Sequence, residues 1–203
     1  MINARLTTTI AAAVALLAPA AAPASTLTLD GRSCYEQDER FEFTGTGFSP
    51  EINLSFNLTE SGFPDENGDT AGFFHTPVLE TYVPQTLSLI ATDQDPSRST
   101  QATFFAVKFG SNLPIAGGRL RDRVTWQFAG FPAGSTVYGH FRQNNRTVKN
   151  VRFGRVSGPC GTLRVNARRI PVPKAKRKGG WYVQVDTSPR FSFATRPEYD
   201  RTI

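Results

Sequence analysis

Residues 41–58 read FEFTGTGFSPEINLSFNL, and residues 124–141 read VTWQFAGFPAGSTVYGHF. The two stretches align without gaps: in each, an alternating apolar run leads into a Gly-Phe pair and then into a second alternating run. Alternation with a period of two is typical of β-strands that bury one face. A glycine after such a strand permits a left-handed bend, and the phenylalanine that follows can tuck into the core. The repeat therefore predicts two copies of a strand–turn–strand unit.

The remaining chain has the same period. Asn144 and Asn145 lie between two strand-like runs and predict a tight hairpin, because Asn tolerates positive φ. No window after residue 24 has a sustained helical period. We expect an all-β fold of two tandem immunoglobulin-like β-sandwich domains, residues 25–112 and 113–203, with a linker near residues 111–118. Further strands are predicted at residues 86–92, 101–109, 136–142, 148–153, 163–170 and 181–186.

Residues 1–24 have the three-part layout of a secretory signal peptide. Arg5 precedes an apolar run at residues 10–17, and small residues follow, ending in Ala-Pro-Ala at residues 22–24. The run is too short to cross a bilayer. The alternative, a helix packed in the domain, fits poorly because the run is apolar all round. We expect cleavage near Ala24 and a protein that is secreted, extracellular or held in the cell envelope, with no transmembrane segment in the mature chain.

The two cysteines, Cys34 and Cys160, would meet an oxidising compartment after export. A cysteine pair there tends to form a disulfide, and we expect one between these residues. The other interpretation makes Cys160 a nucleophile, because residues 157–164, SGPCGTLR, are similar to the Ser-His-Gly-Cys-x-Arg box of secreted L,D-transpeptidases. The histidine of that box is absent. Without a nearby base the thiol is not activated, so we expect no catalytic role.

Three stretches of the first half carry a family resemblance: residues 45–50 (GTGFSP), residues 67–73 (NGDTAGF) and residues 89–93 (LIATD). Together they resemble bacterial Ig-like modules of the IPT/TIG type, in which a Gly-x-Gly-Phe-x-Pro turn and an Asp-x-x-Gly-x-Phe segment recur. The similarity covers residues 41–109 and reaches the second half through the Gly-Phe-Pro of residues 130–132. As a whole, the chain resembles exported proteins of high-GC actinobacteria. The resemblance implies an Ig-like fold and a spacer, adhesion or binding role, and it implies no catalytic site.

Charge is divided unevenly between the two halves. Residues 25–112 contain four basic and 13 acidic residues, a net charge of −9, whereas residues 113–203 contain 18 basic and four acidic residues, a net charge of +14. Arg164 and Arg168 are predicted to face away from the inward residues Leu163, Val165 and Ala167. The densest basic run, residues 168–178, has no acidic residue and six candidate polyanion-binding residues: Arg168, Arg169, Lys174, Lys176, Arg177 and Lys178.

Three hypotheses explain this division of charge. The acidic half could dock against the basic half, with the predicted disulfide at the seam. The basic half could instead bind an anionic polymer of the envelope, such as teichoic acid, an acidic polysaccharide or lipid head groups, through its electric field. Finally, the basic run could be a solvated loop that keeps the protein dispersed and guards a sheet edge. Nucleic acid is not an expected partner, because export separates the protein from it.

The remaining candidates for chemistry are weaker. Residues 65–69, DENGD, alternate oxygen-bearing side chains as a calcium loop does, but the glycine and closing glutamate of that loop are missing, so an acidic hairpin loop is the simpler interpretation. His75 and His140 have no partners at ligand spacing and are expected to be strand residues. Trp126 and Trp181 lie in alternating runs and are expected in the core. We expect no metal and no cofactor.

These observations favour an exported, non-enzymatic structural or binding module. Its expected partners are anionic envelope polymers or another surface protein. An envelope hydrolase or transferase is the alternative from a different class, because acidic residues abound in the first half and could include paired catalytic carboxylates. No nucleophile elbow, zinc-binding helix or phosphate-binding glycine loop selects such an activity.

Overall fold

The computed structural model describes residues 24–50, 54–56, 59–62, 64–114, 119, 121–172 and 180–192. These residues form an all-β protein in which one short 3-10 turn, Pro96–Arg98, is the helical element of the described chain. No helix among them is long and apolar enough to span a membrane. The predicted signal peptide, apart from Ala24, and the candidate residues Lys174, Lys176, Arg177 and Lys178 lie outside the described residues.

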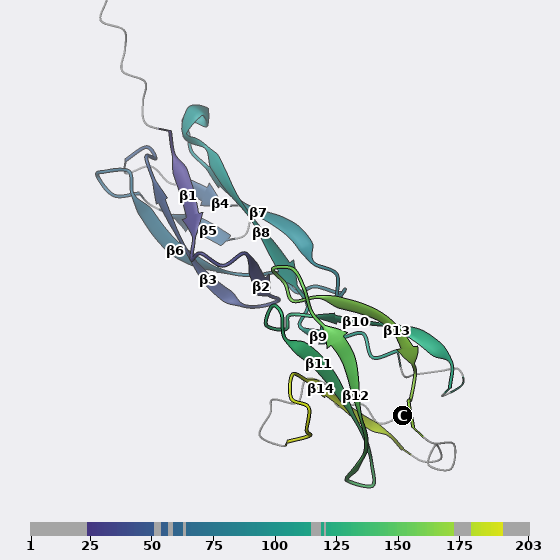
Figure 1. Ribbon diagram of the computed structural model, residues 1–203. Coiled ribbons are helices and arrows are strands. Elements are labelled where there is room, and N and C mark those ends of the chain that lie inside the picture. The colour runs from purple at the N-terminus through teal and green to yellow at the C-terminus, as the bar shows by residue number, and fades with distance from the viewer. Residues whose placement is uncertain are drawn as a thin grey trace, which may run out of the picture.

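Strands β1 to β8 form the N-lobe, which has two sheets (Figure 1). One sheet has the order β1-β3-β6, made of β1 (Thr26–Leu29), β3 (Arg40–Thr46) and β6 (Thr70–His75). All its pairs are antiparallel. The other has the order β2-β8-β7-β4-β5, and its β2–β8 pair alone is parallel. Its strands are β2 (Cys34–Glu36), β8 (Thr100–Val107), β7 (Gln85–Thr92), β4 (Leu54–Phe56) and β5 (Thr59–Gly62).

Strands β9 to β14 form the C-lobe, again with two sheets. One has the order β13-β10-β9, made of β13 (Leu163–Arg168), β10 (Arg123–Ala129) and β9 (Gly110–Ser111). The other has the order β12-β11-β14, made of β12 (Arg146–Arg155), β11 (Thr136–Gln143) and β14 (Tyr182–Asp186). Because β9 pairs with β10, the first C-lobe sheet already begins at residue 110. Asn144 and Asn145 have φ values of 47° and 59°, so the predicted tight hairpin between β11 and β12 is confirmed.

Each lobe has its own hydrophobic core, to which both of its sheets contribute. In the N-lobe, Phe41 and Phe43 of β3 meet Leu89 of β7 and Phe104 of β8. In the C-lobe the core includes both tryptophans, so their predicted burial is confirmed. The C-lobe core draws on β10, β11 and β14 through Trp126, Phe128, Val137, Phe141, Val183 and Val185.

The internal repeat is present in the backbone as well as in the sequence. Gly47 and Gly130 follow β3 and β10 with φ values of 78° and 83°, the left-handed bend that the Gly-Phe pairs predict. Phe48 and Phe131, the next residues, are both buried. The Gly-Phe turns of the two aligned stretches therefore occupy like environments, as a structural duplication requires.

The two lobes lie end to end and meet at a small apolar seam (Figure 1). Val107 at the end of β8 packs with Ala129 at the end of β10 and with Cys160, while Cys34 and Tyr82 pack against their edge. A disulfide joins Cys34 to Cys160 across the seam, with a Cα–Cα distance of 5.2 Å and a sequence separation of 126 residues. The disulfide predicted from the sequence is thus confirmed.

Candidate binding face and junction pocket

Along strands β10 and β13, every second side chain points toward the core, and the side chains between them point toward solvent. Leu163, Val165 and Ala167 of β13 pack against the C-lobe core, as the alternation predicts, and the residues between them are exposed. The antiparallel register places Arg123 opposite Arg168, Thr125 opposite Asn166, and Gln127 opposite Arg164. Cross-strand partners share a face of the sheet. We call these six residues the basic face: Arg123, Thr125, Gln127, Arg164, Asn166 and Arg168.

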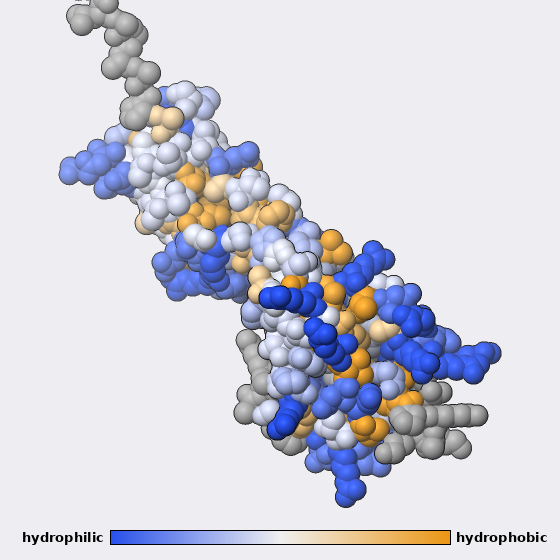
Figure 2. All heavy atoms as spheres, in the orientation of Figure 1, coloured by the Kyte–Doolittle hydropathy of each residue, from blue (hydrophilic) through white to orange (hydrophobic). Residues whose placement is uncertain are grey.

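None of the three arginines on the basic face forms an ion pair with an acidic side chain among the described residues. Arg123 donates hydrogen bonds to the side-chain and backbone oxygens of Asn166, 3.3 Å away for the side chain. The ion pairs between described side chains do not include Arg164 or Arg168. Hydrophilic residues accordingly gather on the side of the C-lobe where β10 and β13 lie (Figure 2). The face thus offers guanidinium groups whose charge is not locally compensated.

The structure separates the two adjacent arginines of the predicted basic run. Arg168 is exposed on the basic face. Arg169 points elsewhere: it is half-buried, its guanidinium donates to the carbonyl of Pro114 at 2.9 Å, and its backbone N–H donates to the carbonyl of Asp122 at 2.8 Å. Strand β13 ends at Arg168, and Arg169 begins the bend that follows, so the two side chains are not held on one face of the sheet. The partner of Arg168 is Arg123, which the sequence run did not include and which the alternation of β10 could have revealed.

A pocket of about 460 Å³ lies where the two lobes meet, at the end of the basic face that carries Gln127 and Arg164. Arg164 and Gln127 belong to both the face and the pocket. Tyr82, Val83 and Pro84 of the N-lobe form the opposite wall. Lys108 extends toward the same wall, with its Nζ 5.4 Å from the centre of the Tyr82 ring. The remaining lining residues are Phe128, Leu163, Ser157 and Thr162.

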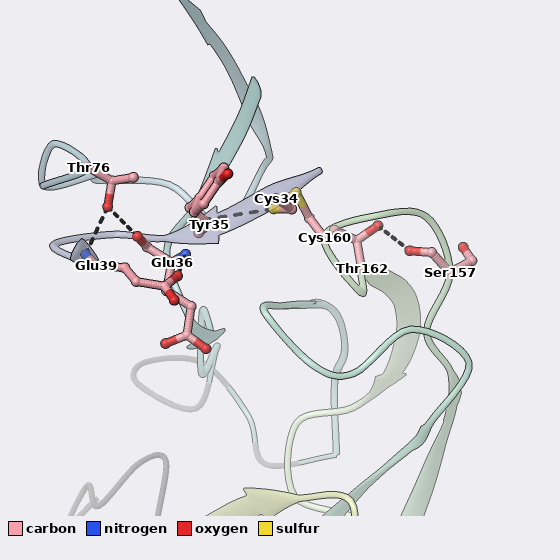
Figure 3. Close-up of a disulfide and its surroundings, with 8 residues drawn as sticks. All are labelled: Cys34, Tyr35, Glu36, Glu39, Thr76, Ser157, Cys160 and Thr162. Carbon is pink, nitrogen blue, oxygen red and sulfur yellow. Dashed lines mark hydrogen bonds between the residues drawn. A yellow bond between two sulfur atoms is a disulfide. The ribbon is translucent and has the colours of Figure 1, made fainter. Parts of the chain in front are cut away.

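The disulfide fixes the walls of this junction pocket relative to each other. Cys160 lies in the turn between Ser157 and Thr162, which line the pocket, and Cys34 anchors that turn to strand β2 of the N-lobe (Figure 3). On the N-lobe side, the buried hydroxyl of Thr76 donates to the Glu36 carbonyl. The pocket therefore exists because two lobes are held in one arrangement.

A second pocket at the seam, about 430 Å³, includes the disulfide itself and Arg32 in its lining. The cation in its lining, Arg32, forms ion pairs with Asp30 and Glu39. The hydrogen bond from Arg32 holds the pKa of Asp30 below its ordinary value, and burial with a hydrogen bond to Asp30 raises the pKa of the Tyr35 phenol. This network ties down the loop before β2 and leaves Arg32 less available for an anionic ligand than Arg164.

Sequence reasoning missed a buried polar cluster on β11 and β14. His140 lies in a strand, as expected, but its Nε2 is 3.0 Å from Oδ1 of Asp186 and its Nδ1 is 2.9 Å from Oδ1 of Asn150. The ring is fully buried. Asp186 comes from a strand 46 residues later, so spacing along the chain gave no signal. Because the ring cannot meet solvent or substrate, the cluster is suited to a structural role rather than to proton transfer.

The other histidine and the acidic loop also have defined places. His75 lies in β6, as expected, with Asp38 as an exposed neighbour at 3.8 Å. In the loop of residues 65–69, Oδ1 of Asp65 accepts backbone hydrogen bonds from Asn67 and Asp69 at 2.8 and 2.9 Å. That carboxylate organises the turn. Within the described ranges, no group of three His, Cys, Asp or Glu side chains is placed to hold a metal ion.

The charges of the two lobes do not meet across the seam. Every ion pair between described side chains joins two residues of the same lobe, and the seam cluster itself is apolar. Among the described residues, no carboxylate of the N-lobe neutralises the arginines of the basic face.

No protein-family model matches the chain, and no curated protein matches it either.

Proposed function

We propose that the protein is an exported, non-enzymatic binding module that holds an anionic polymer of the cell envelope on the basic face of its C-lobe. The observation that carries the proposal is the register of β10 and β13, which places Arg123, Arg164 and Arg168 on one solvent-facing surface. Planar guanidinium groups pair well with carboxylates and phosphates, often through two parallel hydrogen bonds. An extended ligand could therefore contact several of them at once.

The apolar seam supports an external target for the positive charge. If the acidic lobe neutralised the basic lobe, carboxylates of one lobe would pair with cations of the other. The described ion pairs stay within their lobes, and Val107, Ala129 and the disulfide occupy the seam. A field that is not cancelled at the seam acts on ligands over about 10 Å at 0.1 M salt. The solvated-loop hypothesis covers residues 168–178 and does not account for Arg123 and Arg164, which lie outside that run.

We further propose that each lobe is an immunoglobulin-like domain. In the N-lobe, the order β5-β4-β7-β8 opposite β1-β3-β6 fits the C′-C-F-G and A-B-E sheets of that fold. In the C-lobe, β12-β11-β14 opposite β9-β10-β13 fits the same scheme over the described strands. Such sandwiches serve widely as rigid platforms whose surface residues, rather than their fold, define a partner.

Affinity for an immobilised acidic polysaccharide, polygalacturonate, tests this function, with uncharged dextran as the reference surface. The variant that carries both Arg164→Gln and Arg168→Gln is expected to bind polygalacturonate about tenfold more weakly than the wild type. A matched control, Arg146→Gln with Arg190→Gln, removes the same charge from exposed positions outside the basic face and is expected to lose less than about threefold.

The same binding experiment is repeated at increasing ionic strength. Binding should weaken steeply with added salt, because the Debye length falls from about 10 Å at 0.1 M to about 3 Å at 1 M. Equal losses for the two double variants would mean that net charge, and not the basic face, governs binding. Retention that is the same on dextran and polygalacturonate would remove the function altogether.

A further inference from the structure

We infer that the junction pocket binds one sugar ring of the polymer, a ring that carries a carboxylate or a phosphate. The inference rests on the proposed function, and it adds a second element of recognition. The basic face presents three arginines and the polar side chains of Thr125, Gln127 and Asn166, and it has no aromatic side chain. The pocket combines charge with an aromatic wall, and that combination distinguishes an acidic saccharide from other polyanions.

One cation lines the pocket, and a second lies near the aromatic ring of its N-lobe wall. Arg164 lines it from β13, and Lys108 extends toward the Tyr82 ring from the segment that follows β8. Arg164 has no acidic partner in the described chain, so its guanidinium can pair with the anionic group of a sugar. Because Arg164 also belongs to the basic face, a polymer lying along β10 and β13 is led directly into the pocket.

The wall opposite Arg164 suits the apolar side of a sugar ring. Tyr82, Val83 and Pro84 supply an aromatic ring, a side chain that is 54% exposed, and a proline. A tyrosine ring offers a broad apolar surface on which the C–H face of a sugar ring can pack, and its hydroxyl can form a hydrogen bond. Sugar hydroxyls require hydrogen-bonding partners, and Gln127, Ser157 and Thr162 line the remaining side. A volume of about 460 Å³ is within the usual range for small-ligand sites.

The pocket is lined by both lobes, so ligand binding depends on how the lobes are placed relative to each other. Tyr82 and Val83 belong to the N-lobe, whereas Arg164 and Gln127 belong to the C-lobe. The Cys34–Cys160 disulfide ties the C-lobe turn that carries Ser157 and Thr162 to the N-lobe. Reduction of the disulfide should therefore weaken sugar binding in the pocket more than it weakens the binding of charge to the basic face.

Calorimetric titration of the full chain with four probes tests the pocket. Trigalacturonate and sucrose phosphate represent the carboxylate and the phosphate forms of the ligand, galactotriose is a sugar without charge, and tripolyphosphate is a charge without sugar. At equal ionic strength we expect at least one acidic sugar to bind about tenfold more tightly than tripolyphosphate, and galactotriose to bind most weakly. The stronger of the two acidic sugars identifies the anionic group.

Three variants assign that preference to the pocket. Tyr82→Ala and Val83→Ala should each reduce the preference for the acidic sugar over tripolyphosphate, and Tyr82→Phe should retain most of it because the ring is kept. Val78→Ala is the matched control: Val78 is 76% exposed in the same β6–β7 connection and does not line the pocket. Val83→Ala removes an exposed side chain, so the test does not depend on the seam packing of Tyr82.

The experiments distinguish a wrong pocket inference from a wrong proposed function. If all anions bind with similar affinity, or if Tyr82→Ala and Val83→Ala leave the preference unchanged, the pocket inference is overturned and charge binding by the basic face stands. If neither acidic sugar nor tripolyphosphate binds, both are overturned. A preference for acidic sugar that survives these substitutions places the sugar site elsewhere and also contradicts the inference.

Discussion

Gly68 and Gly161 are equivalent residues of the two lobes, and each lies directly against the backbone of the buried phenylalanine of its lobe. A Cβ atom on Gly68 would come within 2.3 Å of the Phe48 carbonyl oxygen, and one on Gly161 within 1.5 Å of the Phe131 carbonyl oxygen. Both glycines have positive φ, 80° and 50°, and both donate a hydrogen bond to the residue three positions earlier. The duplication thus extends beyond the aligned stretches to a second loop that closes over each Gly-Phe turn.

Gly161→Ala should lower the free energy of unfolding by about 2 kcal/mol or more, because it adds a backbone clash to the strain of a left-handed alanine. Gly158→Ala, in the same turn, is the matched control: its φ is 73°, but nothing lies within 4 Å of its Cβ position. We expect that variant to lose only about 1 kcal/mol. Urea denaturation followed by tryptophan fluorescence measures both, and equal losses would contradict the claim that the Phe131 backbone leaves no room for a side chain at residue 161.

Asp93 is expected to stabilise the N-lobe in a pH-dependent manner. Its buried carboxylate accepts hydrogen bonds from the backbone N–H groups of Ser49 and Asp95 at 2.7 and 3.0 Å. Burial raises the pKa of Asp93, but these hydrogen bonds outweigh burial and hold the pKa below its ordinary value. A lowered folded-state pKa contributes stability above about pH 4, and this contribution is lost as the pH falls through the folded value.

Asp93→Asn should therefore lower the free energy of unfolding by about 1 to 2 kcal/mol at neutral pH. The difference from the wild type should shrink as the pH falls below about 4, where the wild-type carboxyl becomes protonated. Circular dichroism during urea denaturation at several pH values measures this. Asp38→Asn, at a side chain that is 79% exposed, serves as the control. A difference that grows on acidification would show that the carboxylate is not favoured in the folded state.

The disulfide should stabilise the junction more than either core. Closing a loop of 126 residues is worth about 5 kcal/mol in the chain-entropy estimate. The double variant Cys34→Ser with Cys160→Ser should unfold at lower urea concentration, while the native fluorescence of Trp126 and Trp181 stays unchanged, because their core does not include the cystine. Small-angle scattering should report a wider range of lobe arrangements. An unchanged midpoint and scattering profile would mean that the apolar seam alone fixes the lobes.

His140 is expected to be a structural residue of the C-lobe. His140→Ala removes a fully buried ring and leaves the buried Asp186 carboxylate without its histidine partner, so we expect a loss of about 3 kcal/mol. His75→Ala, at a side chain that is 56% exposed, should change stability by less than about 0.5 kcal/mol. Thermal unfolding followed by tryptophan fluorescence compares the two. Similar midpoints for both variants would refute the structural assignment of His140.

Alternation predicted the strands that bury one face and the side chains that they expose. Strands β3 and β10, the β11–β12 hairpin and the outward direction of Arg164 and Arg168 all follow from local patterns, because side chains of a strand alternate strictly. Strands β1, β2, β5, β6 and β9 were not predicted, and β2 and β9 show why most clearly. They are two or three residues long, and partners distant in the sequence, β8 and β10, make them strands.

The junction pocket could not be predicted from any local pattern. Its walls come from the β6–β7 connection, from β10 and β13, and from the turn around Cys160, and they meet only once both lobes are folded and joined. The His140–Asp186 contact is similar, because strand pairing between β11 and β14 brings the two residues together. Charge, in contrast, is visible in the sequence, and the structure adds which cations share a surface.

Backbone amide chemical shifts recorded while polygalacturonate is added to the full chain test the basic face most directly. We predict that the largest changes fall on β10 and β13, around residues 123–127 and 164–168, and that they diminish as salt is added. Changes centred on the N-lobe sheets, or the absence of any change at low salt, would contradict the assignment of ligand binding to this face.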